Sequence, residues 1–136
     1  MTVLNRSTCE DCGRILYERG GQLMIEAARM ASGVAPADTF MADLERRGEF
    51  DKLADIAIRF ENFAQTGTLN VPVQLKHLED GIHQIKPVTV RLLFYYTNHF
   101  NRKTVRLTNG YIKLARECPP KHIRLAKRVR GDDQLS

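Results

Sequence analysis

The spacing of apolar residues changes from a helical to a strand-like period about halfway along this chain of 136 residues. From Phe50 to Ala64 the apolar residues recur every three or four positions, which predicts an amphipathic helix over residues 49–65. A shorter helix is predicted to begin near Pro36, because proline is tolerated in a first helical turn, and to end at Gly48. Two helices joined this closely are expected to form a hairpin that packs on another element.

The second half of the chain has the pattern of β-strands. Its strand-like segments are 82–86, 88–96, 104–108 and 111–114. Short connections between consecutive strands require antiparallel pairing. Pro119-Pro120 then begins a basic helix that is expected to bury Ile123, Ala126 and Val129. The expected fold class is α+β: an N-terminal helical hairpin packed on a small curved antiparallel sheet, with a basic C-terminal helix.

The length of the chain predicts a single domain, since domains cluster near about 100–150 residues. We assign residues 22–130 to this domain. Residues 1–21 show little periodicity and are expected to form a loosely ordered arm, and residues 131–136 a short tail. The run over residues 22–28 is short and apolar, and its composition leaves both strand and helix open.

The sequence gives no sign of a membrane or secreted protein. No apolar run approaches the roughly 18 residues that a membrane span needs, and no secretory signal pattern follows Met1. The chain has 3 cysteines, an odd number that argues against a disulfide framework. We therefore expect a soluble cytoplasmic protein with no membrane partner.

Positive charge is concentrated in the second half. Residues 1–70 carry 8 Lys and Arg against 11 Asp and Glu, whereas residues 71–136 carry 13 against 5. Such asymmetry favours an anionic partner, most often a nucleic acid. An ordinary solvated surface of Lys and Arg explains the composition equally well.

Four segments of the second half carry a resemblance to a known family. They are Leu75–Ile82 (LKHLEDGI), Val90–Tyr96 (VRLLFYY), Leu107–Lys113 (LTNGYIK) and Pro120–Ala126 (PKHIRLA). In this order and spacing they resemble the RelE/HigB-type toxins of the RelE/ParE superfamily, in particular the phage-derived HigB-like branch. The resemblance covers roughly residues 23–130.

This resemblance implies a microbial-RNase-like fold with two helices against a curved antiparallel sheet. It also implies ribosome-dependent, metal-free cleavage of mRNA, which blocks translation, with ribosomal RNA as a further contact and no cofactor. A cognate antitoxin, expected to be of the helix-turn-helix type, would neutralise such a toxin.

Metal-free cleavage of RNA uses the 2′-hydroxyl of the substrate against the adjacent phosphate, so the enzyme must move protons and stabilise charge on phosphorus. Matching the family pattern, we expect Arg91 and Lys113 to stabilise the phosphate and Lys86 to stabilise charge or transfer a proton. His77 and His83 are further acid–base candidates, because histidine titrates near neutral pH. Each of these residues is also compatible with an ordinary structural or surface role.

Further cations are expected to contact RNA along the sheet and the terminal helix. They are Arg106, Lys121, Arg124, Lys127 and Arg128. On a ribosome they would hold ribosomal RNA rather than read its sequence. The alternative is a helix whose charges only keep it soluble.

Three positions depart from the family pattern. Gln84 stands where an acidic residue is frequent, Asn109 where many relatives have histidine, and Leu114 where they have a second lysine. These departures leave open a different catalytic set, reduced activity or none. Two other functions therefore remain: inhibition of DNA gyrase by binding, as in the ParE branch, or a nuclease-dead, phage-derived module that binds RNA or protein.

The cysteines offer one candidate metal site. Cys9-x-x-Cys12 is half of a zinc site, and Cys118 with His122 four positions later would complete a Cys₃His set. Thiolate and imidazole suit zinc, but the family resemblance predicts no metal. Free thiols in a reducing cytoplasm are the alternative.

Overall fold

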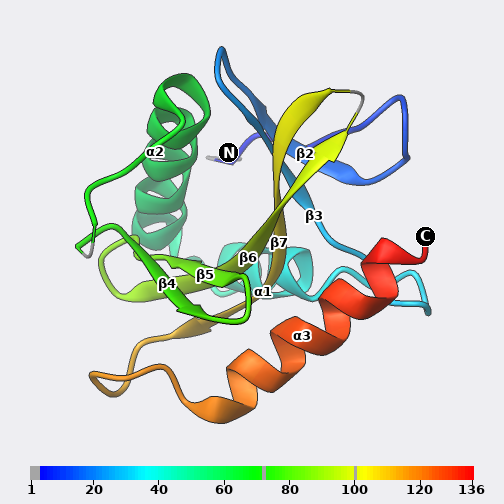
Figure 1. The fold of residues 1–136 in the computed structure, drawn as a ribbon. Coiled ribbons are helices and arrows are strands. Elements are labelled where there is room, and N and C mark those ends of the chain that lie inside the picture. Colours follow the sequence, from blue (N-terminus) through cyan, green and yellow to red (C-terminus); the bar gives the residue numbers. More distant parts are fainter. Residues whose placement is uncertain (1–3, 72, 100) are drawn as a thin grey trace.

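The computed structural model describes residues 4–71, 73–99 and 101–136. These residues form one seven-stranded mixed sheet and three helices (Figure 1). In chain order the elements are β1 (Ser7–Thr8), β2 (Ile15–Arg19), β3 (Met24–Ala27), α1 (Pro36–Arg46), α2 (Phe50–Thr66), β4 (Leu75–Glu79), β5 (Ile82–Ile85), β6 (Val90–His99), β7 (Arg102–Ile112) and α3 (Pro120–Gln134). The strands lie in the order β1-β2-β3-β7-β6-β5-β4.

The expected fold class is wrong in the position of the hairpin and in the nature of the sheet. Three strands precede α1, which begins at Pro36, so the helical hairpin is not N-terminal. The sheet has seven strands and is mixed, because β3 runs parallel to β7 while the other neighbours are antiparallel. Residues 1–21, expected to form a loose arm, supply β1 and β2.

The position of β3 explains why the sequence pattern was misleading. This strand lies between β2 and β7 in the interior of the sheet, and all four of its residues are buried. A strand covered on both faces has no polar side and therefore lacks the alternation that identifies a half-exposed strand. Without a recognisable β3, nothing in the sequence indicated that β1 and β2 extend the sheet beyond β7.

Elements with a strong period formed close to their expected positions. The helix predicted over residues 49–65 is α2, which ends at Thr66 and is followed by a capping Gly67 with a φ of +77°. The basic helix begins at Pro120, and its buried residues include Ala126 and Val129. It continues to Gln134 and so takes in most of the expected C-terminal tail.

The helices cover both faces of the sheet (Figure 1). Leu92 and Phe94 of β6 belong to the core beneath α1 and α2. Leu93 and Tyr95, which alternate with them, pack with α3 in a second core on the opposite face. Among the helices of the described residues, none has both the length and the apolar composition needed to cross a membrane.

The β2–β3 turn docks tightly on the end of α2. The backbone N–H groups of Gln22 and Leu23 both donate to the carbonyl oxygen of Ala64, at 2.9 and 3.1 Å. The side chain of Arg102, at the start of β7, donates to the carbonyl of Gly20. A Cβ atom on Gly20 would lie only 2.3 Å from the backbone of Ala64. Close approach of the two backbones therefore requires glycine at this position.

Candidate functional site

The ends of β5, β6 and β7 meet the segment after β7 around a pocket of about 290 Å³. We call it the cationic pocket, because its lining includes Lys76, Lys86, Arg91, Lys113 and Arg116. Glu117 is the one acidic residue among the described residues that line it. Gathering so many like charges in one concave site costs energy unless an anion neutralises them.

The three residues predicted to act on RNA lie together in this pocket. Lys86 follows β5, Arg91 lies on β6 and Lys113 follows β7. The backbone N–H of Lys113 donates to Thr89 at 2.8 Å, and that of Lys86 donates to Gln74 at 3.0 Å. Backbone pairing at the strand ends thus brings these three side chains to one site.

Arg91 is only 8% exposed, and its side chain is fixed by the turn before it. Its Nη1 atom donates to the carbonyls of Val88 and Val90, both at 2.8 Å. Val88 has a φ of +51°, a left-handed conformation that costs a β-branched residue about 1–2 kcal/mol. The guanidinium carries five N–H donors, and these two bonds use Nη1 alone. Arg91 is therefore positioned before any ligand arrives.

The environment of Lys86 suits a residue that exchanges a proton. Burial lowers the pKa of Lys86, and the positive charges of Lys76, Arg91 and Lys113 lower it further. Glu117 acts in the opposite direction as the last of these causes. A lysine with a lowered pKa gives up its proton more readily near neutral pH.

Tyr111 connects the cationic pocket to the start of α3. Its hydroxyl donates to Oε1 of Gln84 at 3.0 Å, and its ring stacks on His122 with a centroid distance of 4.1 Å. Burial and a hydrogen bond with Cys118 raise the pKa of Tyr111, so the phenol stays protonated at neutral pH. Asn109 has a structural contact with α3, because its side-chain amide donates to the backbone carbonyl of His122 at 3.1 Å.

His77 and His83 do not line the cationic pocket. They face each other across β4 and β5 with ring centroids 4.9 Å apart, and His83 also stacks on Phe94. Phe94 belongs to the core beneath α1 and α2. The two histidines therefore lie on the sheet face opposite the side chain of Gln84, by strand alternation.

The cations expected to bind RNA divide into two groups. Arg106 is 5% exposed and forms internal ion pairs with Glu26 and Asp133, and Lys127 pairs with Glu79 at 2.6 Å. Lys121, Arg124 and Arg128 are exposed on α3, and their spacing places them along one face of the helix. Only this second group is oriented for a partner in solution, and we withdraw Arg106 from the RNA-binding set.

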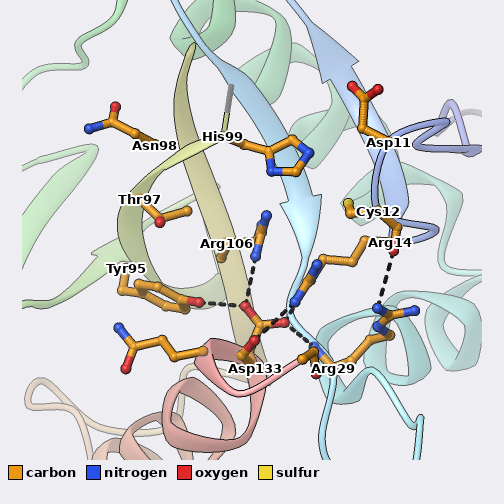
Figure 2. A pocket seen from close by; sticks show the side chains of 12 residues that line it. Asp11, Cys12, Arg14, Arg29, Tyr95, Thr97, Asn98, His99, Arg106 and Asp133 are labelled. Carbon is orange, nitrogen blue, oxygen red and sulfur yellow. Dashed lines mark hydrogen bonds and ion pairs between the residues drawn. The ribbon is translucent and has the colours of Figure 1, made fainter. Parts of the chain in front are cut away.

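A buried ion-pair cluster around Asp133 was not foreseen from the sequence. Its carboxylate accepts hydrogen bonds from Arg14 Nε at 2.8 Å, Arg106 Nη1 at 2.9 Å, the Arg29 amide at 2.8 Å and the Tyr95 hydroxyl (Figure 2). Burial alone would raise the pKa of Asp133, but these hydrogen bonds and the charge of Arg106 leave it lowered. The cluster thereby joins α3 to β6, β7 and the N-terminal strands.

The structure does not assemble the zinc ligands suggested by the sequence. Cys118 lines the cationic pocket and His122 stacks on Tyr111. Cys9 and Cys12 instead lie beside His99, at the end of β6. No local spacing in the sequence connects His99 to the cysteines, because the strand pairing alone brings them together.

No family model matches the chain, and no curated protein matches it.

The sequence analysis missed three residues that also line the cationic pocket: Lys76, Tyr111 and Arg116. Their position within or just after two of the four recognised segments is the signal that could have found them.

Proposed function

We propose that this protein is the toxin of a type II toxin–antitoxin system and cleaves mRNA on the ribosome at the cationic pocket. The observation that carries the proposal is the convergence of Lys86, Arg91 and Lys113 on one pocket. The resemblance to the RelE/HigB-type toxins points to the same three residues on the sequence alone.

The proposed reaction is attack of an mRNA 2′-hydroxyl on the adjacent phosphate, which forms a 2′,3′-cyclic phosphate and breaks the P–O5′ bond. The proton removed from the 2′-hydroxyl passes to the leaving 5′-oxygen, which departs as a 5′-hydroxyl. In this scheme Lys86 accepts or relays the hydroxyl proton, because its pKa is lowered by burial and by neighbouring cations. Arg91 and Lys113 stabilise the negative charge that develops on the phosphate oxygens. Arg91 suits this role because its guanidinium is already held by the turn, so little ordering is needed when the phosphate binds.

The partners follow from the same proposal. The exposed cations Lys121, Arg124 and Arg128 would contact ribosomal RNA through its phosphates. A cognate antitoxin of the helix-turn-helix type would neutralise the toxin in the cytoplasm, and covering the cationic pocket with acidic residues is the simplest way to do so.

Inducible expression in a bacterial host tests this proposal. We expect the wild-type chain to arrest growth and to produce new mRNA 5′ ends that map within translated codons. Lys86→Ala and Lys113→Ala are each expected to reduce cleavage by at least about 100-fold, since proton transfer or charge stabilisation typically contributes about 10²–10⁴-fold. Lys52→Ala is a matched control, because Lys52 lies on α2 and pairs with Glu49, away from the pocket.

Three results would count against the proposal. Absence of new mRNA ends at a toxic level of the protein would exclude cleavage, and induction of DNA damage in the same cells would favour gyrase inhibition. Cleavage that persists in both lysine variants would show that the reaction occurs elsewhere on the molecule.

A further inference from the structure

Three side chains with metal-binding atoms meet between the β1–β2 turn and the end of β6. One ligand atom from each of Cys9, Cys12 and His99 lies within 4.8 Å of the other two. Around tetrahedral Zn²⁺, with Zn–S of about 2.3 Å and Zn–N of about 2.0–2.1 Å, ligand atoms stand about 3.6–3.8 Å apart. We propose that these residues bind one Zn²⁺ ion, with the Glu26 carboxylate at the fourth position.

The backbone around the two cysteines is already folded as a tight turn. The N–H of Gly13 donates to the carbonyl of Cys9 at 2.8 Å, and the N–H of Cys9 donates to Arg14 at 2.7 Å. Gly13 has a φ of +75°, which glycine adopts without strain. Burial raises the pKa of the Cys9 thiol to about 11, and hydrogen bonds with the backbone amides of Asp11 and Cys12 act against that rise. Two thiols held by one turn lose little freedom when they bind a metal.

Glu26 provides an oxygen atom beside both sulfurs. It is 0% exposed, and its Oε2 lies 3.8 Å from the Cys12 sulfur, while Cys9 also forms a hydrogen bond with this carboxylate. Its other oxygen accepts from Arg106 Nε at 2.7 Å. Zinc accepts carboxylate oxygen alongside sulfur and nitrogen, and a carboxylate fixed by a second partner is well oriented as a ligand.

The charges around the site allow a metal ion to enter. Glu26 and Asp133 are balanced by Arg106 and Arg14 in the adjoining ion pairs. Zn²⁺ bound to two cysteines displaces their two thiol protons, and a neutral imidazole adds no charge. The ion with its two thiolates therefore leaves the balance of this buried region unchanged. The Arg14 guanidinium, which forms a hydrogen bond with Cys12, would support the thiolate from outside the ligand set.

The site has a route to solvent and a structural role. Cys12 and His99 line a pocket of about 470 Å³, where Figure 2 shows both side chains near Asp11. Cys9, the third of these residues, is buried. Zinc would tie the segment between β1 and β2 to the end of β6. We infer a structural ion, because four protein ligands leave no open position for chemistry.

Metal titration of the full-length chain tests the site. After treatment with a chelator, the wild-type protein is expected to bind one Zn²⁺ per chain in competition with a chromophoric chelator and to gain thermal stability on binding. Co²⁺ should give the visible absorption of a tetrahedral site together with thiolate-to-cobalt charge transfer in the near ultraviolet. A wild-type chain that takes up no Zn²⁺ and shows no such Co²⁺ spectrum would overturn the proposal.

Matched variants assign the ligands. Cys12→Ser and His99→Asn are each expected to weaken Zn²⁺ binding by at least about 100-fold, and Glu26→Gln by about 10–100-fold. Cys118→Ser and His122→Asn, the alternative ligands suggested by the sequence, should leave binding unchanged. If these two variants lose binding, or Cys12→Ser and His99→Asn keep it, the assignment is wrong. Undiminished affinity in Glu26→Gln would refute the fourth ligand. Circular dichroism of each variant before metal is added separates lost binding from lost folding.

Discussion

Asp133 connects distant parts of the fold, and nothing in the sequence near the end of the chain indicates this. Its neighbours Arg14 and Arg106 are nearly as buried as the carboxylate itself, and they lie far apart in the sequence. A buried ion pair gains little over an apolar replacement of both partners, but removing one partner leaves the other charge buried and unpaired. Loss of the Asp133 carboxylate would therefore leave Arg14 buried without its ion-pair partner and would remove one of the two partners of Arg106.

We predict that Asp133→Asn lowers the free energy of unfolding at neutral pH by about 3–5 kcal/mol, measured by urea denaturation. Asp132→Asn is the control: its Oδ2 accepts one hydrogen bond, from the Ala31 amide, so a loss of about 1 kcal/mol is expected. Equal losses of unfolding free energy in the two variants would show that the ion-pair cluster contributes no more to stability than a single hydrogen bond.

The same substitution should change how stability depends on pH. The pKa of Asp133 is lowered in the folded protein, so its stabilisation is present above the unfolded value of about 3.9 and is lost as the pH falls through the folded pKa. Unfolding curves of the wild type are therefore expected to shift to lower urea concentration as the pH falls below about 4, and those of Asp133→Asn to shift less. If the stability of the wild type and of Asp133→Asn fell by the same amount over this pH range, titration of Asp133 would not be the cause.

At the scale of elements, a clear apolar period is found only where one side of an element faces solvent. The helix α2 has a buried stripe and an exposed one, so its apolar residues repeat every three or four positions, whereas β6 is covered on both faces and was predicted from its β-forming residues. The short strands β1 and β4 are too brief or too exposed to show a period, and β3 is buried on both sides. Pairing between distant strands, such as β3 with β7, has no local signal at all.

Alanine substitutions at two glycines are predicted to change the stability of the protein in opposite directions. Gly20→Ala should destabilise the protein near the upper end of the roughly 1–3 kcal/mol typical of overpacking, because the new Cβ meets backbone atoms of Ala64 rather than a flexible side chain. Gly131→Ala should stabilise it by about 0.5–1 kcal/mol, because Gly131 lies in α3 with no atom within 4 Å of an added Cβ. Thermal unfolding of both variants checks the pair, and a neutral Gly20→Ala would show that the β2–β3 turn can move away from α2.

At the scale of the whole molecule, the excess of positive charge is less available than the composition implies. Arg106 is internal, and Lys127 and Arg130 pair with acidic residues of the β4–β5 turn. The resemblance to known toxins identified Lys86, Arg91 and Lys113, because those positions stand inside or beside recognisable segments. It could not separate exposed from buried cations, since burial depends on packing across the sheet.

If the exposed face of α3 contacts RNA phosphates, its effect should appear in the salt dependence of binding. The variant Lys121→Ala, Arg124→Ala, Arg128→Ala is expected to bind single-stranded RNA more weakly and to reduce the slope of log K against log salt by about 2, since each lost phosphate contact contributes about 0.7. The RNA should carry 2′-O-methyl groups, which block cleavage during titration by removing the attacking hydroxyl.

A second triple variant, Arg46→Ala, Arg47→Ala, Lys52→Ala, changes the net charge equally on the helices of the opposite face. If binding depends on net charge alone, both variants will lose affinity and slope to the same extent. If α3 forms part of the interface, only the α3 variant will lose affinity and slope, because counterions are released where side chains contact phosphates. Equal behaviour of the two variants would therefore remove α3 from the RNA-binding surface while leaving the cationic pocket to be tested by its own lysine variants.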